Sequence, residues 1–394
     1  MHLQQPLDRT PASSPDRRFP RGAATRLAQA ASIALTAGVA TPARAAEVTD
    51  LPPKFRGDVH VAYGGSFQQV GIAESAPDGT DRTFAVRNTV EHDLTFRLEG
   101  AVWKGVVVTL GLPITVQQRI FYPTDPATGL PAAREMLYEP SVGVGSFANG
   151  QPFAAPEYTS GGLQGAWIGV AVAPTSEHYR TSLPITSRLD LAVRTPGAKS
   201  TLYGQSRGAS PGGAAIRLAG AFSAERGKAN PYTSFSWTHE LPATVPEVYD
   251  NEGHLLATDV AVRGDDKFDA NLGAELVVRE KPGTDLRVAI DVYAGFGYRG
   301  WQDMPSGFYL PDVLDISRGQ TVTRSEYLLA RGGLALDWAI NRWAALRLGA
   351  EGRYITPHRI EDAYSAHTDP QSYEVGWTFG LVGRIRTKDD PATL

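Results

Sequence analysis

Apolar and polar side chains alternate from Phe84 to Val116, and the alternation continues through a tight turn. Apolar residues take the even positions, such as Val90 before the turn and Val108 after it, while charged, polar or small residues take most of the odd ones. A period of two residues indicates extended strands. Each limb has the roughly 9–11 residues that a tilted strand needs to cross a bilayer. The run therefore predicts a hairpin whose apolar face either covers a soluble core or contacts lipid.

Similar alternation recurs along the chain and gives twelve predicted strands. No segment beyond the N-terminal region shows a sustained 3.6-residue period, and no run of about 18 apolar residues exists that would make a spanning helix. The first predicted strand is short and is marked by Val59, Val61 and Tyr63. The others are residues 84–101, 105–121, 162–173, 185–196, 213–225, 232–241, 267–279, 285–299, 325–338, 344–356 and 372–386.

The connections between these strands alternate between short turns and long loops, except that 174–184 is long for a turn. We assign residues 137–147 to a loop, because a thirteenth strand there would break the alternation. Outer-membrane barrels have short periplasmic turns and long external loops, which a soluble sheet has no reason to sort in this way. We therefore predict an all-β, antiparallel up-and-down transmembrane barrel of about twelve strands, with an exported soluble β-protein as the alternative. The predicted short turns are 102–105, 226–231, 280–284 and 339–343, and the long loops are 65–83, 122–161, 197–212, 242–266, 300–324 and 357–371.

The N-terminal segment has the pattern of a secretory signal peptide. A basic region from Arg17 to Arg26 precedes a short apolar stretch from Leu27 to Ala40, and Ala43-Arg44-Ala45 offers a cleavage site. The absence of cysteine suits an exported protein. We predict the outer membrane of a Gram-negative bacterium as its location. The expected divisions are a signal peptide (1–45), a short periplasmic segment (46–56), the barrel (57–386) and a polar tail (387–394).

Charge argues against a nucleic-acid partner. The formal net charge of the 394 residues is -4 at pH 7, and residues 1–45 carry six arginines against two aspartates, so their removal leaves -8. An acidic protein repels a phosphate backbone. Near the C-terminus, Glu374, Gly376, Phe379 and Leu381 resemble the signal by which barrel-assembly machinery recognises a final strand. The partners that we expect are this machinery, outer-membrane lipid and lipopolysaccharide, and an unidentified small solute, with no cofactor.

If the apolar face contacts lipid, charged residues of the other parity line the lumen. Their positive members are all arginine, whose rigid fork pairs bidentately with carboxylates. Two interpretations stay open, a network of ion pairs that fills the barrel or a polar pore, because twelve strands lie between filled barrels of about eight strands and open ones of about sixteen. The predicted lumen-lining residues are Arg87, Glu91, Asp93, Arg97, Glu99, Arg188, Asp190, Arg194, Arg217, Glu275, Arg279, Arg287, Asp291, Arg331, Asp337, Arg347, Glu351, Arg353, Glu374 and Arg384.

Motifs for catalysis or metal binding are weak, and we predict no catalytic residue and no metal ligand. The sequence Gly204-Gln205-Ser206-Arg207-Gly208 matches a nucleophile-elbow pattern, but no helical pattern follows it. His239 lies at a lipid-facing position near the external rim. A lipid-modifying enzyme with a histidine there needs a serine beside that histidine. The neighbouring lipid-facing positions hold no serine. The acidic clusters at 250–254 and 265–266 lack the spacing of a calcium loop.

Three segments resemble a known family of bacterial proteins. They are Leu98–Val102 leading into Val108–Pro113, then Gly162–Trp167, then Leu191–Gly197. In this order they resemble the outer-membrane barrels named for the MetA pathway of phenol degradation, although Gln164-Gly165 replaces the family's Gly-Asp and Thr195-Pro196 inverts its Pro-Thr. The resemblance implies a barrel that carries small, often hydrophobic solutes and has no agreed catalytic residues. We expect a passive channel or transporter, with two alternatives: a structural or interaction barrel with an ion-pair-filled lumen, and an outer-membrane lipid-modifying enzyme.

Overall fold

A computed structural model gives the fold of most of the predicted barrel, and the described residues belong to one compact unit within residues 33–394. Their regular structure is entirely β. Among them no helix is long and apolar enough to cross a membrane. The predicted signal peptide, the periplasmic segment, the polar tail, residues 137–147, the nucleophile-elbow pattern and the 250–254 cluster lie outside them. The described residues are 57–75, 81–103, 105–121, 157–175, 185–197, 213–224, 228–249, 255–281, 286–305, 321–341, 343–361, 366–369 and 371–385.

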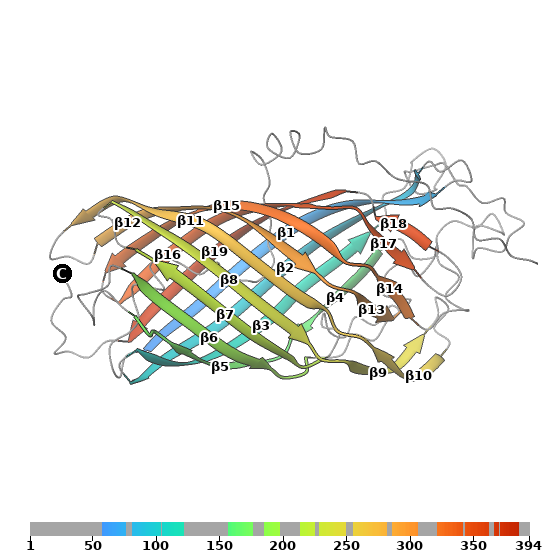
Figure 1. The fold of residues 1–394 in the computed structure, drawn as a ribbon, viewed down its shortest axis with the longest axis horizontal. Helices are drawn as coiled ribbons and strands as arrows, with labels where there is room; N and C mark the ends of the chain where they lie inside the picture. Colours follow the sequence, from blue (N-terminus) through green and yellow to red (C-terminus); the bar gives the residue numbers. More distant parts are fainter. Residues whose placement is uncertain are drawn as a thin grey trace, which may run out of the picture. The chain divides into compact units, whose positions relative to one another are not determined.

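Twelve strands close into one antiparallel barrel, which confirms the predicted fold class (Figure 1). Each strand pairs with the next along the chain, and the last pairs with the first, with Gly57 opposite Ile385. Closure satisfies the backbone of every strand and leaves no open edge. The wall consists of β1 (Gly57–Ser75), β2 (Asp81–Trp103), β3 (Val106–Phe121), β4 (Glu157–Leu163) with β5 (Trp167–Val172) as one interrupted strand, β6 (Thr186–Arg194), β7 (Ala215–Ser223), β8 (Ala229–Glu240), β11 (Asp266–Lys281), β12 (Leu286–Arg299), β15 (Tyr327–Asn341), β16 (Ala344–Ile355) and β19 (Ser372–Ile385).

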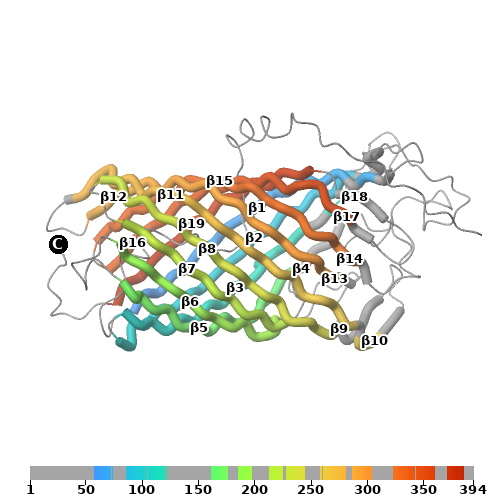
Figure 2. Tube along the Cα trace, viewed as in Figure 1, coloured from blue at the N-terminus to red at the C-terminus, as the bar shows by residue number. Residues whose placement is uncertain are grey.

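Three of the predicted long loops contain hairpins beyond the barrel wall. Figure 2 shows them together at one end of the barrel, which we call the long-loop end. The tight turn at Gly105 lies at the opposite, short-turn end, as predicted. The hairpins pair β9 (Ala243–Tyr249) with β10 (Leu255–Val262), β13 (Gln302–Pro305) with β14 (Thr321–Arg324), and β17 (His358–Glu361) with β18 (Ala366–Asp369).

The predicted first long loop, 65–83, is wrong. β1 continues to Ser75 and β2 begins at Asp81, and their pairing runs without a gap from Gly65 opposite His92 to Ser75 opposite Asp81, apart from one irregularity. Glycines and glutamines hide the alternation in the sequence at 64–69. Backbone pairing does not need an apolar side chain at every second position, so the strand extends past its recognisable pattern.

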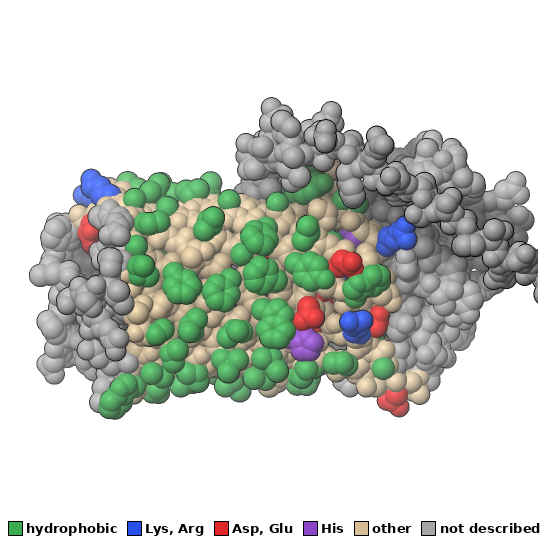
Figure 3. Space-filling model, viewed as in Figure 1, with side chains coloured by type: hydrophobic (Ala, Val, Ile, Leu, Met, Phe, Trp, Pro, Cys, Tyr) green, Lys and Arg blue, Asp and Glu red, His purple; other side chains and the backbone are tan. Residues whose placement is uncertain are grey.

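The outward face of the barrel is a belt of exposed apolar side chains (Figure 3). Leu272 is 70% exposed and Phe296 is 57% exposed, and Trp103 at the short-turn end is 61% exposed. Monomeric soluble proteins rarely expose apolar surface on this scale. The belt is therefore the lipid-facing surface of a transmembrane barrel.

Candidate functional site

The charged side chains that alternate with the outward apolar residues meet on the concave face of the barrel. Arg188 on β6 donates from Nη2 to Oε1 of Glu99 on β2 over 2.9 Å, although β3 and β5 lie between these strands. Arg347 on β16 reaches past β15 to Asp291 on β12. Contacts that skip strands are geometrically possible only inside a curved sheet. These residues therefore lie in the lumen.

Ion pairs at the short-turn end of the lumen centre on Glu99. Its Oε1 accepts hydrogen bonds from both Arg97 and Arg188. The Arg188 guanidinium also donates from Nε and Nη2 to Asp190, at 2.9 and 2.8 Å. Glu99 and Arg188 are both buried. All four residues were predicted to line the lumen, and the structure joins them into one network.

Three inward residues beside this network have the side-chain types of a metal site, although no metal ligand was predicted. The potential ligand atoms of Asp58, His60 and Glu99 lie within 4.8 Å of one another. Register explains the grouping, because Asp58 is opposite Glu99 and His60 is opposite Arg97. Two guanidiniums already compensate the Glu99 carboxylate and repel a cation. We therefore interpret the group as part of the ion-pair network.

A network around Asp291 joins β8, β12 and β16 on the inward face of the wall. The Tyr232 hydroxyl donates to Asp291 Oδ1 over 2.8 Å, and Arg347 Nη2 donates to Oδ2 over 3.0 Å. Arg347 Nη1 lies 3.5 Å from Oδ2 of Asp337. Asp291 is 2% exposed. A carboxylate this buried needs its two hydrogen-bonding partners.

Paired glycines make room for two tyrosine rings in the same layer. Tyr232 is opposite Gly273 and Tyr293 is opposite Gly333. A Cβ atom on Gly273 would lie 2.5 Å from Tyr232 Cζ, and one on Gly333 would lie 2.7 Å from Tyr293 Cζ. The rings therefore lie flat over the neighbouring strands, where the Tyr293 hydroxyl donates to Glu351.

Glu275 forms a second buried acidic centre in this part of the wall. It accepts hydrogen bonds from Arg287 and from Asn230 Nδ2, the latter over 3.4 Å. Glu275 is 2% exposed, whereas the Arg287 side chain is 29% exposed. The pair therefore buries its carboxylate and leaves part of its guanidinium at the lumen surface.

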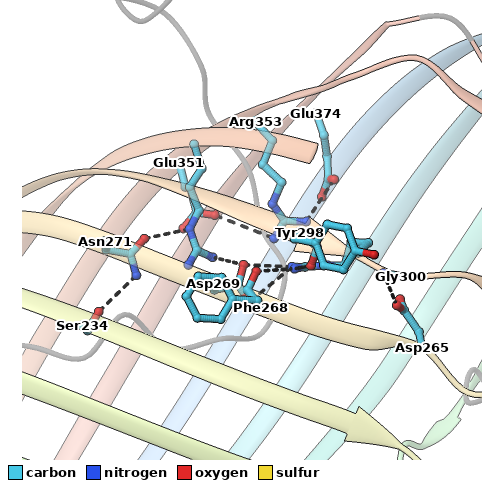
Figure 4. A network of polar contacts seen from close by, with 12 residues as sticks. Ser234, Asp265, Phe268, Asp269, Asn271, Tyr298, Gly300, Glu351, Arg353 and Glu374 are labelled. Carbon is cyan, nitrogen blue, oxygen red and sulfur yellow. Dashed lines mark hydrogen bonds and ion pairs between the residues drawn. The ribbon is translucent and has the colours of Figure 1, made fainter. Parts of the chain in front are cut away.

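A third network lies toward the long-loop end (Figure 4). Asp269 pairs with Arg299 at 3.1 Å and with Arg331 at 3.4 Å. Arg331 Nε also donates to Asn271 Oδ1 over 2.8 Å. The sequence analysis missed Asp269 and Arg299. Asp269 has the same parity as Glu275 on β11, and Arg299 has the same parity as Arg287 on β12. Arg353 bridges Glu374 and Glu351 in the same view, at 3.3 and 3.8 Å.

The remaining predicted lumen residues lie along the wall. Thr115 donates to Asp93 over 2.9 Å, and Gln118 donates to Glu91 over 3.0 Å. Arg194 lies 3.4 Å from Glu240, which also pairs with Lys267 at 2.7 Å. Lysine therefore does occur on the inward face. By register, Arg87 lies opposite the buried Val70, Arg384 opposite Asp58, and Arg217 opposite Ala192.

Arg279 is wrongly predicted as a lumen residue. β11 carries a bulge between Val277 and Arg279, and beyond it Arg279 lies opposite Val288. Val288 shares the outward parity of Ile290 and Val292 on β12, and paired residues point to the same side of a sheet. The extra residue of the bulge thus turns Arg279 outward at the short-turn end.

A buried carboxyl at the long-loop end lies beyond the apolar belt. Asp265 precedes β11 and is fully buried, accepting a hydrogen bond from the Gly300 backbone N–H over 2.8 Å and one from Arg324 Nη2 over 3.4 Å (Figure 4). Its neighbour Asp266 is exposed and pairs with His239. Burial raises the pKa of Asp265 to about 6, against the opposing effect of Lys267 and Arg324.

We expect this carboxyl to make barrel stability depend on pH. Between the ordinary pKa of 3.8 and about 6, the folded state binds more protons than the unfolded state, so the free energy of unfolding falls as pH rises through this window. Asp265→Asn should flatten the fall, whereas the exposed Asp266→Asn should not. The midpoint of heat-induced mobility shift on gels, measured from pH 4 to pH 7, checks this; equal slopes in all three proteins would contradict it.

His239 has one element of a hydrolytic site but not the nucleophile. Its Nδ1 lies 2.9 Å from Asp266 Oδ1, and its ring stacks on Trp237 with centroids 5.8 Å apart. Its register partners are Ile216 and Asp266. Neither carries a hydroxyl that the histidine would activate, so this described part of the rim supplies no Ser–His pair.

No protein-family profile matches the chain, and no curated protein matches it in sequence. Solved structures with a similar arrangement include outer-membrane proteins. An outer-membrane channel from Pseudomonas putida F1 has 10% identity and a TM-score of 0.48, with 85% of this chain and 97% of that chain covered. A FadL homologue from Pseudomonas aeruginosa has 10% identity and a TM-score of 0.39, with 90% and 99% covered.

An enzyme is also among the similar structures. The outer-membrane protease OmpT from Escherichia coli has 8% identity and a TM-score of 0.33, with 85% of this chain and 98% of that chain covered. Structural similarity at this level is shared with both channels and a protease. Such similarity assigns no function to this chain, and the function has to be argued from its own lumen.

Proposed function

We propose that the chain is a passive channel for small solutes in the outer membrane of a Gram-negative bacterium, exported with a cleaved signal peptide. The observation that carries the proposal is the charged inward face, which extends from Glu99 near the short-turn end to Asp269 near the long-loop end. Buried ion pairs contribute little net stability, and apolar side chains of similar volume do as well or better. A wall lined with charges is therefore better explained by solvent and solutes in the lumen than by stability.

Unequal packing of the charged residues supports a water-filled path. Asp291 and Glu275 are almost fully buried, whereas the side chains of Arg97 and Asp337 are each 20% exposed and that of Asp190 is 19% exposed. Solvent therefore reaches part of the charged wall. The buried layer around Asp291 favours the second candidate, a structural barrel filled by ion pairs.

The finer assignments follow from the sequence. Segments 98–113, 162–167 and 191–197 support a relationship to the barrels named for the MetA pathway of phenol degradation, and hence transport of small, often hydrophobic solutes. At the long-loop end, the exposed His239 and Asp266 lie next to the apolar belt, where lipopolysaccharide headgroups are found. We propose lipid and lipopolysaccharide as membrane partners and the barrel-assembly machinery as the partner during biogenesis.

Conductance separates the two candidate functions. We expect purified protein, shown to be folded by its heat-modifiable gel mobility, to give discrete current steps in planar bilayers. Arg279→Gln, which changes an outward residue, should leave the step size unchanged. A silent record from folded protein would contradict the channel and support the ion-pair-filled barrel.

A further inference from the structure

We infer that the lumen contains a binding subsite for a small carboxylate anion, formed by Arg217, Trp167 and the open backbone at Gly111. The subsite deepens the proposed function and rests on it for its role in transport. Three features of the inward wall support it: an aromatic ring that two guanidiniums contact, an arginine that forms no ion pair within the described residues, and a glycine that leaves space beside the ring.

Trp167 is an aromatic side chain inside a mostly charged lumen. It alternates with the outward Ile168 on β5, and its register partner on β6 is the inward Arg194. The guanidinium carbon of Arg217 lies 4.8 Å from the centroid of the Trp167 ring, and that of Arg194 lies 5.6 Å away. Stacking on an aromatic face holds a guanidinium in place and leaves its edge available to carboxylate oxygens.

Arg217 differs from Arg194 in its partners. Arg194 has Glu240 at 3.4 Å and donates to the Gly213 carbonyl over 3.2 Å. Arg217 forms no ion pair with any residue in the described part of the chain, whereas the buried Nε atoms of both arginines have no hydrogen-bond partner there. Buried polar groups are normally hydrogen-bonded, and an exception calls for a ligand or water. Arg217 thus keeps donors for an incoming acceptor.

Arg217 lies in a cluster of guanidiniums. Arg97 and Arg188 repel it, whereas Asp190 attracts it. The Asp190 carboxylate forms its ion pair with Arg188, at 2.8 Å, so this carboxylate already has a closer partner than Arg217. A bound anion beside Arg217 would lower the repulsion among these guanidiniums.

Gly111 provides room for the body of such an anion. Gly111 lies between Arg97 on β2 and Trp167 on β5 in the same row of the sheet. A Cβ atom built on it would lie 3.4 Å from the Cβ of Trp167, and apart from its chain neighbours no other described residue has a heavy atom within 4 Å of that point. A planar apolar group beside Trp167, with its carboxylate on the Arg217 fork, uses the space, the ring and the unpaired donors together.

The subsite is tested with benzoate as the probe, by isothermal titration of the full-length barrel in detergent micelles. We expect saturable binding that Arg217→Gln weakens by about tenfold or more, because a charge-assisted bidentate pair is lost. Benzyl alcohol lacks the carboxylate. It should bind the wild-type protein no more tightly than benzoate binds Arg217→Gln. Inorganic phosphate shows whether the site takes any anion or requires the apolar body.

Two further variants keep the test decisive. Arg279→Gln removes the same charge from the outward face and should bind benzoate normally. Gly111→Val fills the space with Arg217 intact and should also lose binding, which covers the case in which Arg217→Gln does not fold. The inference is wrong if wild-type protein shows no saturable benzoate binding, if Arg217→Gln binds as wild type does, or if Arg279→Gln loses binding equally.

Ion selectivity in planar bilayers links the subsite to transport. In a potassium chloride gradient, we expect a reversal potential that favours chloride and moves toward cation preference in Arg217→Gln. Benzoate binding by a protein that conducts no current would contradict the channel and keep the subsite. Current without benzoate binding would contradict the subsite and keep the channel.

Discussion

Replacing Asp291 by alanine is expected to lower the free energy of unfolding of the barrel by about 3–5 kcal/mol, the usual cost of removing one partner of a buried ion pair. The substitution removes the carboxylate that accepts from Arg347 Nη2, whose Nη1 lies 3.5 Å from Asp337 Oδ2, and it removes the acceptor of the Tyr232 hydroxyl. Both groups lie where water cannot replace the lost oxygen, because Tyr232 is 5% exposed and Arg347 8%. The strands β8, β12 and β16 would lose their common contact on the inward face of the wall.

Urea unfolding in micelles, followed by tryptophan fluorescence, measures this loss. Asp337→Ala is the matched control, because it removes a more exposed carboxylate that makes a longer contact with the same arginine. Asp291→Asn should fall between the two, since it retains an acceptor for Tyr232. If the two alanine variants are equally stable, the network around Asp291 does not hold the barrel together.

Replacing Leu272 by arginine is expected to cost about 2–4 kcal/mol, the range for a cationic side chain near the bilayer midplane on the lipid face of a barrel. Leu272 lies in the middle of β11 and is 70% exposed. On a soluble barrel the same residue would face water, and the substitution would change stability by no more than about 0.5 kcal/mol. The variant therefore separates a membrane barrel from an exported soluble β-protein.

Leu241→Arg provides the control for depth. Leu241 follows β8 on the outward side, two residues beyond His239, at the edge of the belt. A charge near the interface costs about 0–1 kcal/mol. We expect refolding into liposomes, followed by guanidinium unfolding, to show a large loss for Leu272→Arg and little change for Leu241→Arg. Equal and small changes in both would contradict a lipid-facing belt.

Much of the barrel wall was predictable from the local sequence pattern, and the errors in that prediction have local causes. All twelve predicted strands correspond to wall strands of the barrel, because alternation needs only the residue two positions away. The 65–83 loop was wrong because Gly64, Gly65 and the neighbouring glutamines carry no apolar signal, although their backbone pairs normally. The three hairpins beyond the wall lie in segments that the sequence analysis assigned to long loops.

The candidate site was predictable as a set of residue types but not as a set of contacts. Parity identified Glu99 and Arg188 as inward residues. Their contact joins residues 89 positions apart across two intervening strands. Trp167 was noted only as part of a family resemblance, since a single aromatic residue on the inward parity has no pattern of its own. Its role in the proposed subsite depends on Gly111, which is its register partner, and on Arg217, whose guanidinium contacts its ring.

Side-chain period and turn composition are properties of neighbouring residues, so the sequence was enough to predict which strands form, which faces are apolar and at which end the long loops lie. The folded barrel was needed to show which charges meet, where a bulge turns Arg279 outward, and which arginine forms no ion pair within the described residues. These depend on how the strands are staggered when the barrel closes, and that stagger is a property of the whole sheet.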